Sequence, residues 1–250
     1  QFGFSVASAG DVNGDGFADV IIGANAFDNG ENDEGGAFLY LGSPAGLSTA
    51  PDWSVESDQV GSGFGVSVAS AGDTNGDGFA DVLVGANKYD GGEYDEGAAF
   101  LFLGSPAGPS TAPDWWVESD QIDAQVGVLV ASAGDVNGDG FADVTVGSSF
   151  YDNGEGDEGA AFVFHGSAGG PSSSPDWTAE IDQPDARFGQ AIASPGDING
   201  DGFSDLLVGA TLYDNGEADE GGAFLYLGSA GGLAGSPSWT AESDLALSRM

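Results

Sequence analysis

Cysteine is absent from the 250 residues, and only Lys88, Arg187 and Arg249 are basic. The lack of cysteine excludes a disulfide scaffold and thiolate zinc sites. Against 41 acidic residues, the three basic ones leave a net charge of -38. This charge argues against nucleic acid or an anionic membrane surface as a partner. No apolar run approaches the roughly 18 residues of a membrane span, so we expect no membrane insertion. Cations are the natural counterpart of such a chain.

Histidine is nearly absent as well, since His165 is the only one. Without cysteine or a repeated histidine there is no candidate nucleophile–base pair, and we predict that the chain is not an enzyme. His165 stands where the other units have leucine, which indicates a tolerated substitution at a strand end. A hydrolase that uses carboxylates alone is an alternative. The many equivalent acids instead favour a repeated structural role.

Internal repetition organises the whole chain. The 45 glycines recur at fixed offsets, which is typical of turns rather than of a disordered linker. Aspartates and tryptophans recur every 62 residues without insertion or deletion, at Asp11, Asp73, Asp135 and Asp197 and at Trp53, Trp115, Trp177 and Trp239. We therefore predict four units that together form one domain, residues 1–62, 63–124, 125–186 and 187–250.

Each unit is predicted to contain four short antiparallel strands, in the second unit at residues 65–72, 80–85, 98–103 and 115–118. The β-branched and aromatic residues and the bracketing glycines favour strands over buried helices. The third strand is apolar at successive positions, which predicts cover on both faces. The first strand has small side chains, which suit the axis where sheets converge. The fold class is therefore all-β, with propeller-type blades; a linear solenoid usually repeats in fewer residues.

A nine-residue acidic loop follows the first strand of every unit. Its first copy, residues 11–19, has acidic or amide side chains at positions 1, 3, 5 and 9 and glycine at position 6. Calcium prefers six to eight hard oxygen ligands, and an EF-hand loop uses similar positions before it continues into a helix. Here a strand follows instead. We predict one Ca2+ per repeat, about four in all, held by four side chains and the carbonyl at position 7: Asp11, Asn13, Asp15, Phe17 and Asp19; Asp73, Asn75, Asp77, Phe79 and Asp81; Asp135, Asn137, Asp139, Phe141 and Asp143; and Asp197, Asn199, Asp201, Phe203 and Asp205.

The alternative for this loop is a polar turn that binds no metal. Four intact copies favour the metal, because three neighbouring carboxylates repel one another without a cation. Magnesium fits less well, because it keeps its waters and takes few protein carboxylates. We expect a structural role for the calcium. Weak sites of this kind fill at extracellular calcium levels and not in the cytosol, which indicates an exported protein.

At these residues the sequence resembles the FG-GAP repeat family, known from the amino-terminal propeller of integrin α subunits and from secreted bacterial proteins. Phe64-Gly65 resembles the FG element, residues 73–81 match the calcium loop, and Val84-Gly85-Ala86 resembles the start of the GAP element. The GAP proline is missing from every unit, and Val126-Gly127 replaces Phe-Gly in the third. The resemblance implies that the loop joins the first two strands of a blade and binds calcium on one face of the propeller. It also implies a secreted or cell-surface protein, of bacterial origin.

Four units are fewer than the family's usual seven. The sequence therefore leaves open a closed four-bladed ring, a fragment of a larger propeller, or an open array completed by neighbours. It shows no strand exchange that would close a ring. The chain starts at Gln1 rather than Met, which we interpret as a mature or truncated piece.

Two further features of the repeat have alternative interpretations. A second acidic loop, residues 28–35 and its equivalents, is a solvated turn, a further cation site or a contact with a neighbouring subunit. The tryptophans either anchor one blade on the next or bind sugars. Trp116, the one tryptophan without equivalents, is expected to be exposed.

The leading prediction of function is a non-enzymatic, calcium-binding extracellular scaffold or adhesion module. Its partners would be a protein or glycan ligand, or further copies of the chain. One alternative is a structural subunit of an extracellular assembly or filament. Another is the non-catalytic propeller part of a larger secreted enzyme.

Overall fold

The computed structural model describes residues 1–243, which contain sixteen β-strands and no α-helix, and thus no helix that could cross a membrane. Residues 244–250 of the fourth predicted unit, with Arg249, lie outside the described residues. The strands form four sheets of four. Their bounds are β1 (Ser5–Gly10), β2 (Asp19–Ala24), β3 (Gly36–Tyr40) and β4 (Trp53–Glu56); β5 (Phe64–Gly72), β6 (Asp81–Ala86), β7 (Ala98–Phe102) and β8 (Trp115–Glu118); β9 (Leu129–Gly134), β10 (Asp143–Ser148), β11 (Ala160–Phe164) and β12 (Trp177–Glu180); and β13 (Phe188–Gly196), β14 (Asp205–Ala210), β15 (Gly222–Tyr226) and β16 (Trp239–Glu242).

Each repeat builds one sheet from its own strands, in chain order and with antiparallel pairing throughout. In the second unit the predicted strands agree with β5 to β8 to within one residue at either end. The all-β class and the four blades are therefore confirmed. Within residues 1–243 no strand of one repeat enters the sheet of another, as expected.

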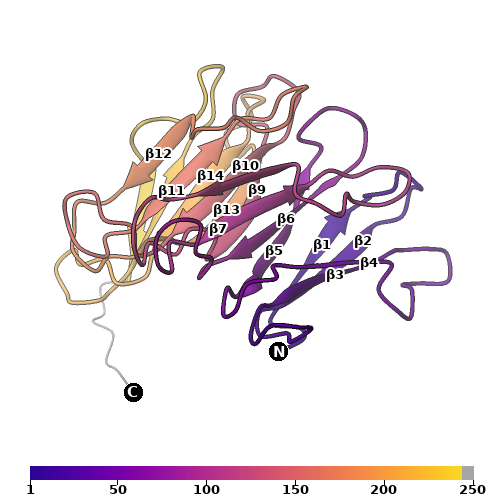
Figure 1. The fold of residues 1–250 in the computed structure, drawn as a ribbon. Coiled ribbons are helices and arrows are strands. Elements are labelled where there is room, and N and C mark those ends of the chain that lie inside the picture. The colour runs from indigo at the N-terminus through magenta and orange to yellow at the C-terminus, as the bar shows by residue number, and fades with distance from the viewer. Residues whose placement is uncertain (244–250) are drawn as a thin grey trace.

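The first strands of the four blades, β1, β5, β9 and β13, lie side by side in that order (Figure 1). Small residues permit this approach. A Cβ added at Gly10 would lie 2.5 Å from the Cβ of Ala80, and one at Gly72 would lie 2.7 Å from that of Ala142. Both glycines also have positive φ angles, 79° in each case. The glycines that end β1 and β5 are thus required by contact with the next blade, in line with the small residues predicted there.

The apolar core consists of three clusters, one between each pair of consecutive sheets. Leu39 of β3 and Phe102 of β7 belong to the first cluster, while Leu101, the neighbour of Phe102, belongs to the second. Successive residues of β7 therefore point into different clusters, and all five residues of that strand are buried. This arrangement is the two-sided cover that the apolar third strands predicted.

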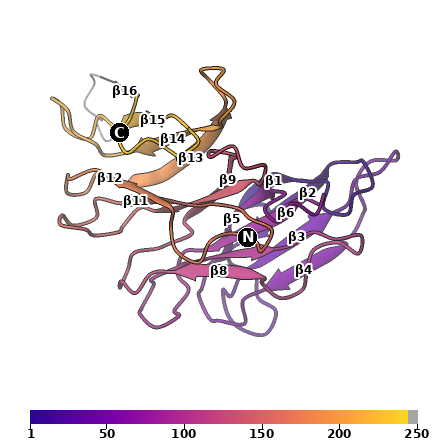
Figure 2. The same ribbon diagram turned by 90° about the horizontal axis from the view of Figure 1, so that it is seen from above.

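The array of blades is open (Figures 1 and 2). The first and fourth sheets lie at its two ends and share no interface comparable to those between neighbouring sheets. Every residue of β16 is exposed, and β1 carries exposed Val6, although the equivalent strands of inner blades are more covered. Of the three predicted architectures, the closed four-bladed ring is thus not the one observed.

Tryptophan anchors each blade on the next. The indole Nε1–H of Trp53 donates to the Ser110 carbonyl at 2.9 Å, and its ring packs edge-on against Phe102. Equivalent bonds join Trp115 to Ser172 at 2.9 Å and Trp177 to Ala234 at 3.0 Å. The packing interpretation of these tryptophans is confirmed. Trp116 is 52% exposed, as expected, and Trp239 at the open end is equally exposed.

The Phe-Gly element forms a second link between blades. Isolated parallel bridges join Gly35 to Phe64, Gly97 to Val126 and Gly159 to Phe188. Val126 therefore takes the place of phenylalanine in the third unit, and it is buried. β9 begins at Leu129, as β1 begins at the equivalent Ser5 although the first unit has Phe2, whereas β5 and β13 begin at the phenylalanine.

Candidate metal centre

The predicted calcium loop joins β1 to β2, and its own side chains shape it. Asp11 accepts backbone N–H bonds from Asp15 at Oδ1 (3.0 Å) and from Gly16 at Oδ2 (2.8 Å). Asn13 Oδ1 accepts from the Asp15 N–H at 3.0 Å, and Asp15 Oδ1 accepts from the Phe17 N–H at 3.0 Å. Gly16 has a φ of 89°, a conformation that side-chain-bearing residues rarely adopt. The oxygens at positions 1, 3 and 5 thus line one turn.

The other three loops repeat this geometry. The carboxylate at position 1 accepts the N–H groups of positions 5 and 6 in every copy. The amide oxygen at position 3 and the carboxylate at position 5 accept the same bonds as Asn13 and Asp15 do. The residues concerned are Asp73, Asn75, Asp77 and Phe79; Asp135, Asn137, Asp139 and Phe141; and Asp197, Asn199, Asp201 and Phe203.

The aspartate at position 9 occupies a different environment. Asp19 is fully buried at the start of β2. Its Oδ2 accepts the Val12 N–H at 2.9 Å, and its Oδ1 accepts the Gly42 N–H at 2.8 Å. Gly42 follows β3, so this carboxylate ties the loop to the next turn of the blade. Sequence reasoning missed this second contact, which recurs at Asp81, Asp143 and Asp205.

Burial shifts the pKa of three of these carboxylates. It raises the pKa of Asp19, with smaller contributions from Asp15 and Asp11, and it raises the pKa of Asp81. For Asp143 burial raises the pKa to about 6, against the opposing backbone bonds from Gly166 and Val136. Asp197, the exposed position 1 of the fourth loop, is unlike these, because the backbone N–H of Gly202 lowers its pKa. A neighbouring cation would favour the charged form of the buried group.

The donors present suit calcium, because all are carboxylate, amide or carbonyl oxygens. Within residues 1–243 no lysine or arginine forms an ion pair with any of the loop carboxylates. Asp11, Asp15 and Asp19 belong to the same loop. Within the described residues, however, their oxygens do not all lie within 4.8 Å of one another. The predicted ligand set therefore stays a prediction. Sequence reasoning also did not single out the acidic group that does meet this distance, Glu34, Glu56 and Asp58.

Successive loops contact one another across the blade interface. The ring of Phe79 lies against Gly14, where an added Cβ would be 2.7 Å from the ring. The Ala80 N–H donates to the Asp11 carbonyl at 3.0 Å, and the Ser105 N–H donates to the Val12 carbonyl at 3.1 Å. The first and second residues of the loop thus hold the following blade. Order in the loop is thereby coupled to order at the interface.

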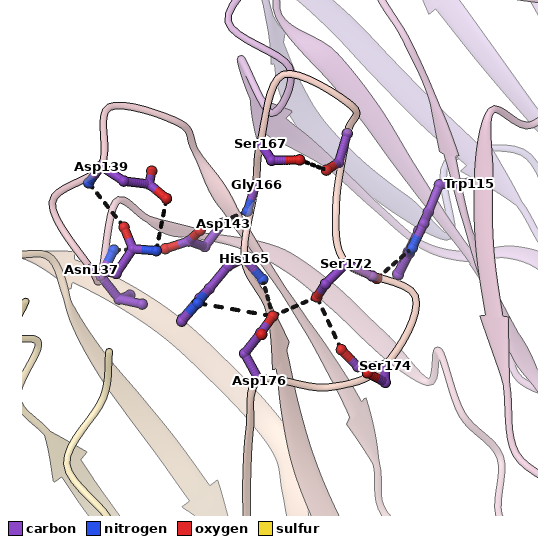
Figure 3. Close-up of polar contacts among 12 residues, drawn as sticks. Trp115, Asn137, Asp139, Asp143, His165, Gly166, Ser167, Ser172, Ser174 and Asp176 are labelled. Carbon is purple, nitrogen blue, oxygen red and sulfur yellow. Dashed lines mark hydrogen bonds and ion pairs between the residues drawn. The ribbon is translucent and has the colours of Figure 1, made fainter. Parts of the chain in front are cut away.

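The surroundings of His165 show why it is a local substitution (Figure 3). Its backbone N–H donates to Asp176 Oδ2 at 2.8 Å, the bond that Leu103 makes to Asp114 in the second blade. The hydroxyl of Ser172 bonds to the same carboxylate and not to the imidazole, whose Nδ1 is 3.9 Å from Asp176. This serine, histidine and aspartate therefore lack the hydroxyl–imidazole bond of a nucleophilic triad.

Comparison with known proteins identifies the same four repeats as the structure. The FG-GAP repeat model matches residues 2–40, 64–102, 127–164 and 188–226. Integrin alpha-PS2 of Drosophila melanogaster is 33% identical over 237 residues, which cover 84% of this chain and 16% of that protein. Integrin alpha-5 of Xenopus laevis is 32% identical over 222 residues, 85% of this chain and 20% of that protein. Human integrin alpha-7 is 31% identical over 185 residues, 70% of this chain and 14% of that protein.

The chain thus spans at most about a fifth of the length of these relatives. Each matched segment begins near the Phe-Gly position or its equivalent, contains one acidic loop and ends with the third strand of a blade. The four matches fall one in each sheet, and together they cover more than half of the residues. The protein is therefore a member of the FG-GAP repeat family, with integrin alpha-like, propeller-type blades.

Proposed function

We propose that this protein is a non-enzymatic, extracellular calcium-binding module in which each of the four loops holds one Ca2+. The observation that carries the proposal is the coupling of each loop to its surroundings. A buried aspartate ties the loop to its own blade through Gly42, and the Asp11 carbonyl ties it to Ala80 of the next. A cation held there would stabilise both connections.

The stabilisation expected from calcium is large relative to a domain's net stability. At free calcium about tenfold above Kd, one site adds about 1.4 kcal/mol, and four independent sites add about 5–6 kcal/mol. A typical domain has a net stability of about 5–15 kcal/mol. Weak sites would fill outside the cell and remain empty in cytosol, which supports a secreted or cell-surface location.

Counting bound calcium tests this proposal. Equilibrium dialysis of the wild-type chain and of a variant with Asp→Asn at position 5 of all four loops should differ by four Ca2+ per chain. The changed residues are Asp15, Asp77, Asp139 and Asp201. A matched control removes the same number of charges at exposed glutamates, Glu31, Glu93, Glu155 and Glu217. Equal calcium binding by the loop variant and the control would refute the loops as calcium sites.

The partner we propose is a protein or glycan ligand. The integrin alpha names of the relatives support an adhesive role, and the net charge of -38 favours ligands that are basic or that bind through a bridging cation. A non-catalytic position within a larger secreted enzyme, and the bacterial origin, stay predictions.

A second candidate function is a structural subunit that joins copies of itself head to tail. It is favoured by the two open ends, which expose Phe4 and Val6 on the first blade and Ile198 and Trp239 on the last. In the other blades, the tryptophan equivalent to Trp239 donates a hydrogen bond to a backbone carbonyl of the next blade. By the same spacing, the acceptor for Trp239 would be the Ser48 carbonyl of a second copy. The observed blade interface would then simply continue between chains.

Sedimentation velocity tests this association. The chain should form concentration-dependent oligomers, and Trp239→Ala should weaken them at least tenfold. Trp116→Ala is the control, because Trp116 is equally exposed but lacks the anchoring position. A chain that stays monomeric up to high micromolar concentration, or that responds equally to both substitutions, would rule out the head-to-tail assembly.

A further inference from the structure

A second set of acidic groups lies at the opposite end of the strands from the predicted calcium loops, in the turn between β2 and β3. Glu34 in this turn is only 1% exposed, and its equivalents Glu96 and Glu158 are fully buried. Their Oε1 atoms accept N–H bonds from the turn: Glu34 from Asn29, and Glu96 from Gly92 at 2.6 Å. The second acidic loop is therefore not a purely solvated turn, because one carboxylate of each copy points inward.

The other oxygen of these glutamates is an exception to the usual pairing of buried polar atoms. Oε2 of Glu34, Glu96 and Glu158 is buried and has no hydrogen-bond partner in the described residues. An unpaired buried carboxylate oxygen is costly. A proton shared with a neighbouring carboxylate would pair this oxygen but would leave the group with a net negative charge. The basic residues do not resolve it either, because neither Lys88 nor Arg187 forms an ion pair with any of the three.

Two further carboxylates approach the buried glutamate. Oxygens of Glu34, Glu56 and Asp58 all lie within 4.8 Å of one another. Glu56, at the end of β4, is held in place by the Asn29 side-chain amide, whose Nδ2 lies 3.0 and 2.9 Å from its two oxygens. Three carboxylates this close repel one another unless a cation lies between them. Carboxylate oxygens are also the ligands that Ca2+ prefers.

We propose that Glu34, Glu56 and Asp58 bind a Ca2+ ion, in a second class of site that is independent of the loops between the first two strands. The ion would accept the unpaired Oε2 of Glu34 as a ligand and neutralise the mutual repulsion of the group. The same three residue types recur as Glu96, Glu118 and Asp120 and as Glu158, Glu180 and Asp182, although within residues 1–243 only the first copy meets the 4.8 Å distance. The fourth copy has Glu220 and Glu242, and its third position lies outside the described residues.

The second blade strengthens the assignment. Gly91 stands there in place of Asn29, so Glu118 has no amide partner, and its Oε2 is a second buried oxygen without a hydrogen-bond partner. A Cβ added at Gly91 would lie 1.6 Å from that oxygen and 2.8 Å from Glu96 Oε1. The two carboxylates therefore converge on the space that a side chain would fill. In this copy two buried oxygens, Oε2 of Glu96 and Oε2 of Glu118, have no hydrogen-bond partner in the described residues.

Bound Ca2+ per chain, measured on the full chain by equilibrium dialysis and elemental analysis, tests the proposal. The buried-site variant carries Glu→Gln at Glu34, Glu96, Glu158 and Glu220, and should bind three or four fewer Ca2+ than wild type. The control carries Glu→Gln at the exposed glutamates of the same turns, Glu31, Glu93, Glu155 and Glu217, and should retain all of them. Equal calcium content in wild type and the buried-site variant would overturn the proposal.

Two further variants separate the loss of the buried site from misfolding and from the loss of calcium at the first loops. Glu118→Gln alone should remove one Ca2+ and serves if the fourfold variant does not fold. A variant with Asp→Asn at position 5 of the four first loops tests the proposed function separately, because its loss should be additional to that of the buried-site variant. If the buried-site variant binds wild-type amounts of Ca2+ and its melting temperature falls equally with calcium and with chelator, the buried oxygens pair with water only, and the second class of site does not exist.

Discussion

Thr74 Oγ1 donates a hydrogen bond of 2.6 Å to Oδ2 of Asp81, the buried aspartate at position 9 of the predicted calcium loop in the second unit. Oδ2 of Asp81 also accepts the Thr74 backbone N–H at 2.9 Å. The equivalent residues of the other units are Val12, Val136 and Ile198, which offer only the backbone bond. Asp81 therefore accepts a side-chain hydrogen bond that the equivalent aspartates of the other units lack.

Thr74→Val should remove that bond and leave the loop in the form that the first and third units already have. The hydroxyl lowers the pKa of Asp81, so its loss should raise that pKa further. Because the bond is to a charged group, we expect a loss of about 1.5–3 kcal/mol in the free energy of unfolding in chelator. Urea unfolding measures this. Val136→Thr is the reciprocal control, and stabilisation by neither threonine would contradict the interpretation.

Gly76→Ala should destabilise the chain more than Gly78→Ala. Both glycines have positive φ angles, 75° and 93°, so alanine at either adds backbone strain of about 1–2 kcal/mol. A Cβ at Gly76 would in addition lie 2.7 Å from the ring of Phe141 in the next blade, whereas nothing lies within 4 Å of one at Gly78. The difference between the two variants, measured by urea unfolding in chelator, isolates the contact between successive loops. Equal effects would show that the Phe141 ring moves away without cost and that the loops are not closely packed there.

Trp177→Ala should destabilise the chain by about 3–5 kcal/mol, because it removes a buried ring and its bond to Ala234. Trp116→Ala should change the unfolding free energy by less than about 0.5 kcal/mol, because this side chain is exposed. Thermal unfolding of the two variants provides the comparison. If Trp116→Ala were as damaging as Trp177→Ala, the assignment of anchoring to the repeated tryptophans would be wrong.

Without calcium, stability should fall as the pH rises from about 4 to 6. The folded-state pKa of Asp143, about 6, lies above its ordinary value of 3.8, so the folded state binds a proton that the unfolded state has released in this window. Asp19 and Asp81 shift in the same direction. The calcium-dependent gain in melting temperature should grow over the same window, since the ion competes with these protons.

Asp143→Asn checks the origin of this pH dependence. It should flatten the decline in melting temperature between about pH 4 and 6 in chelator, because the group no longer titrates. An unchanged slope would show that Asp143 is not the source and would assign the effect to other acidic groups, Asp19 and Asp81 among them.

The features that followed from sequence are those set by local chemistry and by the repeat. Alternation and glycine positions predicted the strands to within one residue in the second unit, and the apolar third strand predicted two-sided cover. The contacts of Asp19 with Gly42 and of Phe79 with Gly14 did not follow, because they join residues that only the folded blade or its neighbour brings together. The burial of Glu34 was missed for a related reason: its turn looks polar in sequence, and Ser57 and Ser62, which bond to the Glu34 carbonyl, lie 23 and 28 residues away in the chain.

Thermal unfolding of the wild-type chain with millimolar Ca2+ and with excess chelator tests the central claim most directly. If the four loops hold structural calcium, the melting temperature should fall by roughly ten degrees or more on chelation, since about 5–6 kcal/mol is lost and 1 kcal/mol corresponds to about 2–4 °C in a chain of this size. Asp→Asn at position 5 of all four loops should abolish most of that difference. Identical melting temperatures with calcium and with chelator would contradict the account.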